Sequence, residues 1–196
     1  MSRTAFVTRN TSETQIEMSL ELDGTGVGVI DTPIGFFNHM MEQFQKHGLF
    51  DLAITATGDT HIDDHHLIED VGIVLGQAFA EAIGDKKGIT RYGFFSLPMD
   101  DALATVALDF SGRYSFGFRV ELAKEKVGDM SSELLRHFWD SFAQNAKVNL
   151  YIKSEYGFND HHIAEGVFKA VSKTLRIACS IDQRLAGRLP STKGAL

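Results

Sequence analysis

The stretch that decides the fold occurs twice, as Asp64-His65-His66-Leu67-Ile68-Glu69 and as Asp160-His161-His162-Ile163-Ala164-Glu165. The second copy follows 96 residues after the first, counted from His65 to His161. Self-similarity at a fixed spacing is the mark of a duplicated structural unit, and it changes how every other motif is interpreted. The sequence therefore predicts a chain made of two related halves.

The segments around the two copies follow the same order of periodicities. Each copy is followed by apolar residues at helical spacing, and each is preceded by an alternating strand, a helix and a strand that ends at a glycine turn. We expect Ser131 or Ser132 to cap the upstream helix of the second half. The upstream strands and helices are predicted at 14–22, 36–47, 49–57, 102–110, 131–144 and 148–154.

The predicted fold is α+β, with the order strand, strand, helix, strand, helix present twice. Each ββαβα-type half should form a small sheet with its helices on one face, and the halves should pair about a pseudo-twofold axis. The charged stretch from Gly84 to Gly88 is the expected boundary. It divides the chain into a first half at 1–88, a second half at 89–186 and a mobile C-terminal tail at 187–196.

Two copies of a His-His-x-x-Glu helix favour metal binding. Neighbouring residues of a helix differ by about 100°, so His65 and His66 point in different directions, while Glu69 shares a face with each. One motif can therefore serve two metals. With one histidine from matching places in each upstream helix, the predicted ligands are His39, His65, His66, Glu69, His137, His161, His162 and Glu165.

Equal division of these ligands gives two metals, each with three histidines and one carboxylate. Imidazole and carboxylate donors without thiolate suit Mn, Fe, Zn or Ni, and four protein ligands leave room for substrate on an octahedral ion. Neighbouring carboxylates are expected to orient the ring nitrogens. The residues concerned are Asp63, Asp64 and Asp160.

Several other polar residues are candidates for contact with a ligand. Steps of four place Gln43 on the helix face of His39, and Lys169 on the face of His161 and Glu165. Guanidinium, ammonium and hydroxyl groups can hold an anion such as phosphate. The candidates for that role are Arg91, Arg113, Ser191 and Lys193.

The composition argues against several other classes of protein. The net charge is −7 and no basic run stands out, so we expect no nucleic-acid partner. No apolar stretch is long enough for a membrane span and residues 1–10 lack a signal segment, so a cytoplasmic location without a membrane partner is expected. The single cysteine, Cys179, lies in an apolar helical stretch and should be inert.

Beyond the repeat, the chain resembles the imidazoleglycerol-phosphate dehydratase family over essentially its full length. The specific motifs are the paired histidine stretches and the tail Pro190-Ser191-Thr192-Lys193-Gly194, supported by Arg9-Asn10-Thr11-x-Glu13-Thr14, Gly35-Phe36-Phe37-Asn38-His39-Met40 and Arg91-Tyr92-Gly93. The chain departs from the family pattern at Pro33, Asn38, Leu67, Asp101 and Tyr151. None of these departures removes an expected ligand, although Asn38 replaces an aspartate beside His39.

The resemblance implies halves of the ribosomal protein S5 domain 2-like type and a homo-oligomer of 24 subunits. It implies two Mn²⁺ per subunit held by the eight donors above, with Glu165 or Glu13 as catalytic base. Some substrate contacts would come from neighbouring subunits. The residues implied in binding substrate are Glu13, Gln43, Arg91, Arg113, Lys169, Ser191 and Lys193.

The activity implied by the resemblance is dehydration of D-erythro-imidazole-glycerol phosphate to imidazole-acetol phosphate in histidine biosynthesis. Two other functions are compatible with paired His/Glu sites. A dimetal phosphoester hydrolase would release phosphate from its substrate. A non-catalytic, metal-assembled shell would hold coordinatively saturated ions and show no turnover.

Overall fold

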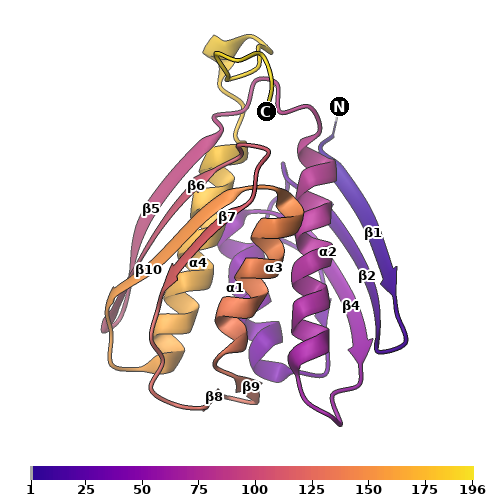
Figure 1. Cartoon of the computed structure of the whole chain (residues 1–196), viewed down its shortest axis with the longest axis vertical. Coiled ribbons are helices and arrows are strands. Elements are labelled where there is room, and N and C mark those ends of the chain that lie inside the picture. The colour runs from indigo at the N-terminus through magenta and orange to yellow at the C-terminus, as the bar shows by residue number, and fades with distance from the viewer. Residues whose placement is uncertain (1) are drawn as a thin grey trace.

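The computed structural model describes residues 2–196, and its first half contains one four-stranded sheet and two helices (Figure 1). The elements are β1 (Thr4–Asn10), β2 (Thr14–Glu21), β3 (Ile30–Asp31), α1 (Gly35–Gly48), β4 (Asp51–Gly58) and α2 (His65–Ile83). The strand order is β1-β2-β4-β3, with β3 parallel to β4 and the other pairs antiparallel. Strand β2 alternates between buried and more accessible residues, which gives the sheet one face in the core.

The second half repeats this arrangement. Its elements are β5 (Tyr92–Met99), β6 (Ala102–Asp109), β7 (Ser115–Arg119), β8 (Lys126–Val127), β9 (Met130–Ser131), α3 (Leu134–Ala146), β10 (Asn149–Tyr156), α4 (Asp160–Cys179) and a 3-10 turn (Gln183–Leu185). The sheet order is β5-β6-β10-β7, with β7 parallel to β10. The predicted α+β architecture is confirmed, and the repeated ββαβα order is present in both halves.

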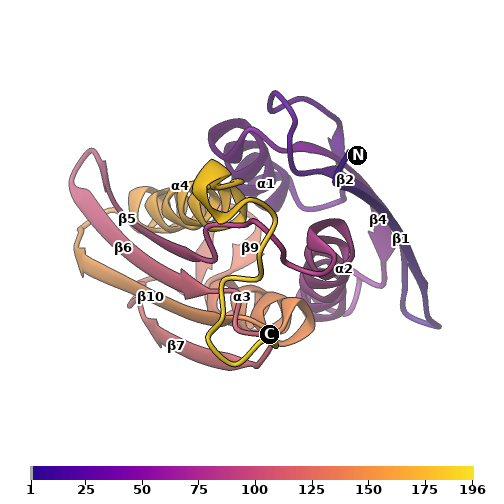
Figure 2. The same cartoon turned by 90° about the horizontal axis from the view of Figure 1, so that it is seen from above.

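The four helices lie between the two sheets (Figures 1 and 2). Helix α2 packs on β1 and β2, and α4 packs on β5 and β6. Helices α1 and α3 each pack against the long helix of the other half, so that α1 lies beside α4 and α3 beside α2. Each half therefore packs its shorter helix against the long helix of the other half. This crossed packing brings histidines from the two halves together.

Large aromatic side chains and two glycines hold this helical layer together. Phe44, Trp139 and Phe142 are fully buried, and burial of each such side chain stabilises the fold by about 1.5–3 kcal/mol. A Cβ atom at Gly72 would lie 2.7 Å from the carbonyl oxygen of Phe138, and one at Gly76 would lie 2.6 Å from that of Phe142. Glycine at both positions lets α2 approach α3 closely.

The start of α3 differs from the sequence-based prediction. The helix begins at Leu134, its N-cap position is Glu133, and Ser131 belongs to β9. Ser131 donates hydrogen bonds from its backbone nitrogen and its hydroxyl to Asp64, and the Ser132 hydroxyl donates to the Glu125 carbonyl. Neither serine is free to cap the helix, so this prediction was wrong.

The C-terminal tail lies at the end of α4 opposite the histidine motifs (Figure 1). Arg188 accepts a backbone hydrogen bond from Gly88 at 2.9 Å, and Arg91 Nη1 donates to the Pro190 carbonyl at 2.8 Å. These contacts tie the tail to the junction of the two halves. The domain boundaries and the mobility of the tail stay predictions. Among the described residues, no helix is both long and apolar enough to cross a membrane.

Candidate metal centre

The first donor cluster contains His39 from α1 together with His161 and Glu165 from α4. Glu165 Oε2 lies 3.1 Å from His161 Nε2 and 3.3 Å from His39 Nε2, while Lys169 pairs with the other oxygen of the same carboxylate. Burial raises the pKa of Glu165, but Lys169 and the two histidines lower it further, so the net shift is downward. The group is therefore held as a carboxylate.

The second cluster contains His65 and Glu69 from α2 together with His137 from α3. Glu69 Oε2 lies 3.6 Å from His65 Nε2 and 3.5 Å from His137 Nε2. The His137 Nε2 atom is buried and has no hydrogen-bond partner among residues 2–196. A buried polar atom without a partner costs about 1–3 kcal/mol, and a cation at this position would satisfy it. The donor set therefore fits a metal ion.

The two clusters are related by the pseudo-symmetry of the fold. In each, an HxxxE pair on the long helix of one half meets a histidine from the shorter helix of the other half. This follows directly from the crossed packing of α1 on α4 and of α3 on α2. Both clusters lie near the N-terminal ends of the long helices, at the end of the molecule away from the tail (Figure 1).

The remaining two predicted ligands, His66 and His162, belong to neither of these clusters, and His66 forms a third group of possible donors with Glu13 and Asp59. His66 Nδ1 lies 3.0 Å from Asp59, and His162 Nδ1 lies 2.5 Å from Asp101. Each carboxylate raises the pKa of its histidine through this hydrogen bond. Both rings are held through Nδ1, and the step of about 100° from the preceding histidine turns them away from the clusters.

The residues that orient these rings were not the ones expected. Asp63 accepts from the backbone of His65, Asp64 accepts from Ser131, and Asp160 accepts from the backbones of 123 and 124. Each of these carboxylates is engaged by backbone N–H groups, from the helix start for Asp63 and from distant segments for Asp64 and Asp160. Asp59 was missed because its contact to His66 arises in a turn, where no periodicity predicts direction.

The two candidate bases lie in different surroundings. Glu165 has both carboxylate oxygens engaged, one by the histidines of the first cluster and the other by Lys169. Glu13 lies at the tip of the β1–β2 hairpin with its side chain 51% exposed, and its Oε2 lies 3.8 Å from His66 Nδ1. The hairpin of the second half has Asp101 at the equivalent place, where it binds His162 and the backbones of Phe158 and Asn159.

Of the predicted substrate contacts, Lys169 is joined to a cluster through Glu165, and Gln43 is half-buried on α1 one turn beyond His39. Glu13 lies near His66 at the histidine end, whereas Arg91, Arg113, Ser191 and Lys193 lie at the opposite end of the molecule. Arg91 is paired with Asp109 at 2.7 Å, and together with Ser191 it lines a hollow of about 560 Å³ that also includes Arg188. Arg113 and Lys193 are exposed in the same region. Helix α4, with 20 residues, separates the two ends by about 30 Å.

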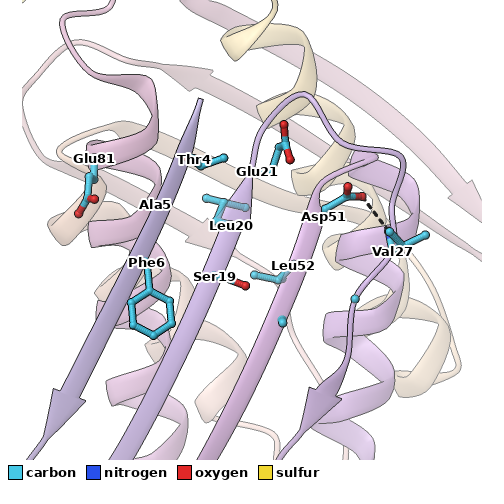
Figure 3. A pocket seen from close by; sticks show the side chains of 12 residues that line it. Thr4, Ala5, Phe6, Ser19, Leu20, Glu21, Val27, Asp51, Leu52 and Glu81 are labelled. Carbon is cyan, nitrogen blue, oxygen red and sulfur yellow. Dashed lines mark hydrogen bonds between the residues drawn. The ribbon is translucent and has the colours of Figure 1, made fainter. Parts of the chain in front are cut away.

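A further hollow of about 530 Å³ lies on the first sheet (Figure 3). Its lining residues include Phe6, Ser19 and Asp51, and Asp51 accepts a hydrogen bond from the Val27 backbone. None of the described residues that line it is a histidine, lysine or arginine. The donor clusters, and not this hollow, are the candidate site.

The fold and the site together define a class of protein, namely duplicated α+β chains with paired His/carboxylate clusters between two sheets. A family model described as imidazoleglycerol-phosphate dehydratase matches residues 32–175. The chain belongs to the imidazoleglycerol-phosphate dehydratase family, as the sequence predicts.

Individual relatives agree with this assignment. The imidazoleglycerol-phosphate dehydratase of Ralstonia nicotianae is 55% identical over 196 residues, covering 100% of both chains. The crystal structure of the Staphylococcus aureus enzyme has a TM-score of 0.83 at 40% identity, covering 91% of this chain and 99% of that one. The Pyrococcus furiosus enzyme, in complex with (S)-C348, also has a TM-score of 0.83, at 34% identity, covering 97% and 100%.

The chain is therefore a hydro-lyase of histidine biosynthesis that acts on a small-molecule substrate, imidazole-glycerol phosphate. This assignment favours dehydration over the phosphoester hydrolase and the non-catalytic shell. Its candidate metal-binding clusters combine histidine with glutamate.

Proposed function

We propose that dehydration takes place at two divalent ions per subunit, one at each donor cluster, and that these ions are Mn²⁺. The observation that carries this proposal is the pair of equivalent three-donor clusters, with the buried, unpartnered His137 Nε2 in one of them. Imidazole and carboxylate donors without thiolate suit such an ion. When bound, the ions would favour loss of the N–H proton from the substrate imidazole, so that its ring electrons could expel the neighbouring hydroxyl.

We further propose that each active site is assembled from several subunits of a homo-oligomer. Three donors per cluster leave positions for a fourth, and His66 and His162 point away from the clusters of their own chain. The phosphate candidates lie about 30 Å from the clusters, which a small substrate cannot span. A 24-subunit assembly, as the resemblance implies, would supply the missing groups. A biosynthetic step on a phosphorylated metabolite fits the predicted cytoplasmic location.

Within this site Glu13 is the proposed base. The carbon acid of the substrate becomes acidic only as the hydroxyl leaves, so a carboxylate must be free to accept the proton at that moment. Glu165 is engaged by Lys169, His39 and His161, whereas the side chain of Glu13 accepts no hydrogen bond from the residues described. Glu165 is therefore assigned to metal binding, and Lys169 to balancing its charge.

Replacement of Glu13 by glutamine should lower kcat by about 100-fold, since general base catalysis contributes on the order of 10²–10⁴. Metal content should stay close to that of the wild type, because Glu13 lies outside the two equivalent clusters and is the exposed member of a third group of donors, with Asp59 and His66. Steady-state kinetics and elemental analysis of Glu13→Gln test this. Glu17→Gln, on an exposed face of β2, is the matched control and should leave kcat unchanged. A wild-type kcat in Glu13→Gln would exclude Glu13 as the base.

Replacement of Arg113 by alanine should raise the KM for substrate by roughly 10- to 100-fold, because a charge-assisted hydrogen bond to phosphate contributes about 1.5–3 kcal/mol. Metal content should not change, since Arg113 lies far from the clusters. Arg184→Ala is the control, because Arg184 is 91% exposed in the same region and pairs with Asp182. Loss of metal with an unchanged KM would show that Arg113 is misassigned.

A further inference from the structure

A buried carboxylate that the proposed chemistry does not use lies directly after a donor of the second cluster. Asp70 follows Glu69 on α2, and its side chain is 9% exposed. It accepts a hydrogen bond of 2.5 Å from the Thr14 hydroxyl, and its other oxygen lies 2.8 Å from Arg9 Nε in an ion pair. Removing a carboxylate from water is costly unless it is paired, so its presence requires an explanation.

The contacts of Asp70 lead to the backbone of Glu13. The Thr14 hydroxyl uses its one hydrogen on Asp70, so the Thr11 hydroxyl, 3.1 Å away, donates to it. The Thr11 oxygen in turn accepts from the backbone nitrogen of Glu13 at 3.1 Å and from that of Thr14 at 2.9 Å. The Glu13 carbonyl accepts from the Asp59 backbone at 3.1 Å. Glu13 is thus fixed by its main chain, while its carboxylate accepts no hydrogen bond from the described residues and has only the contact of 3.8 Å to His66 Nδ1.

The second half of the chain provides an internal comparison. Aligning Glu69 with Glu165 puts Gly166 at the place of Asp70, and aligning the first residues of β2 and β6 puts Ala102 at the place of Thr14. Arg9 and Thr11 then correspond to Leu97 and Met99. A Cβ atom at Gly166 would lie 3.4 Å from Met99 Cβ, so the position faces the same hairpin in both halves.

The second half therefore packs this hairpin on α4 with no carboxylate at the place of Asp70, and its nearest charged group there is Lys169, whose Nζ lies 3.4 Å from Met99 Sδ. The difference coincides with the residue at the hairpin tip. Asp101 is held by its own hydrogen bonds to His162 and to two backbone nitrogens, so its hairpin needs no other anchor for that carboxylate. Glu13 has no such side-chain bonds. The polar network is present only where the carboxylate at the tip accepts no hydrogen bond of its own.

We propose that Asp70 is a positioning residue that, with Arg9, Thr14 and Thr11, fixes the Glu13 hairpin on α2. The network fixes the position of the Glu13 carboxylate relative to α2, which carries Glu69. It does so without contacting the carboxylate oxygens of Glu13, which must accept the proton. Precise placement of a general base lowers the barrier because less motion must be restricted during the reaction. The inference rests on the proposed role of Glu13 as base.

The test replaces the network by the apolar residues of the second half, as Arg9→Leu/Thr14→Ala/Asp70→Ala, with alanine preferred to glycine for helix stability. We expect kcat to fall about 10-fold while KM, metal content and oligomeric mass stay those of the wild type. Hydrogen exchange at residues 11–14 should become at least 10-fold faster, since the Thr11 hydroxyl that accepts from the backbone of Glu13 and residue 14 loses the Thr14 hydroxyl that fixes it. Asp70→Asn keeps an acceptor for Thr14 and should recover most of the loss in kcat relative to Asp70→Ala.

The matched control is Ser96→Ala/Thr105→Val, which removes a hydroxyl pair of 3.0 Å from the hairpin of the second half. It should change neither kcat nor exchange at residues 11–14. In a Glu13→Gln background the triple replacement should cause no further loss, because its effect passes through Glu13. An additional 10-fold loss in that background would overturn the proposal.

Hydrogen exchange at residues 11–14 separates the positioning role of Asp70 from the proposed role of Glu13 as base. If Glu13→Gln keeps wild-type kcat, the base assignment fails, and the positioning role is then judged by exchange alone. Unchanged exchange at residues 11–14 in the triple variant overturns the positioning role whatever the kinetics. If the triple variant does not fold, Asp70→Asn and Asp70→Ala are compared in its place, and equal kcat and equal exchange in these two variants overturn it as well.

Discussion

Removal of bound divalent ions should abolish dehydration and lower the mass of the oligomer. Each donor cluster joins helices of both halves, and we propose that its coordination is completed by a neighbouring subunit, so loss of the ion removes both a catalytic charge and a link between chains. Activity measured together with light scattering after chelation tests this. Addition of Mn²⁺ should restore both the activity and the mass.

A matched pair of histidine variants tests by mutation whether the second cluster binds the metal. His137→Ala should lose metal from the second cluster, whereas His61→Ala, an exposed histidine outside both clusters, should retain it. Elemental analysis measures the difference. Full activity and unchanged mass after verified metal removal would refute the proposed metal site and the assembly that depends on it.

The sequence predicted the repeated helices and strands because their periodicities are long and regular. It did not predict β3 or β7, which have two and five residues and gain their stability by pairing in parallel with β4 and β10. Short strands carry too few alternating residues to be recognised by pattern. The start of α3 was misplaced for a related reason, since Ser131 is held by Asp64, which is 67 residues away in sequence.

Helical spacing predicted which side chains of one helix share a face, but not which helices or turns meet at the site. It correctly indicated that His65 and Glu69 share one face, and that His66 points elsewhere. It could not indicate that His137 would join them, because that contact depends on α3 packing against α2 from the other half. Asp59 and Asp101 lie in turns, where side-chain direction follows from the local backbone and from partners distant in sequence.

The separation of the two ends of the chain leads to a prediction about mixed oligomers. Glu13 lies near His66 at the histidine end of the molecule, while Lys193 belongs to the tail and Arg113 follows Gly112, which lies against Leu196. If an active site combines the histidine end of one subunit with the tail end of another, defects at opposite ends fall in different sites. Two inactive variants, Glu13→Gln and Arg113→Ala/Lys193→Ala, should therefore regain activity when they assemble together.

The expected gain is large and has a defined limit. In an equal, random mixture about one quarter of the sites would combine an intact histidine end with an intact tail end, so activity should rise to about a quarter of the wild-type value. Co-expression with two different affinity tags, followed by sequential purification of the mixed oligomer, provides the sample, and the separately purified parents provide the baseline. A site built within one subunit would contain one defect in every copy. Mixed oligomers with only the average activity of the two parents would therefore contradict the shared site, even if both variants lost activity as predicted.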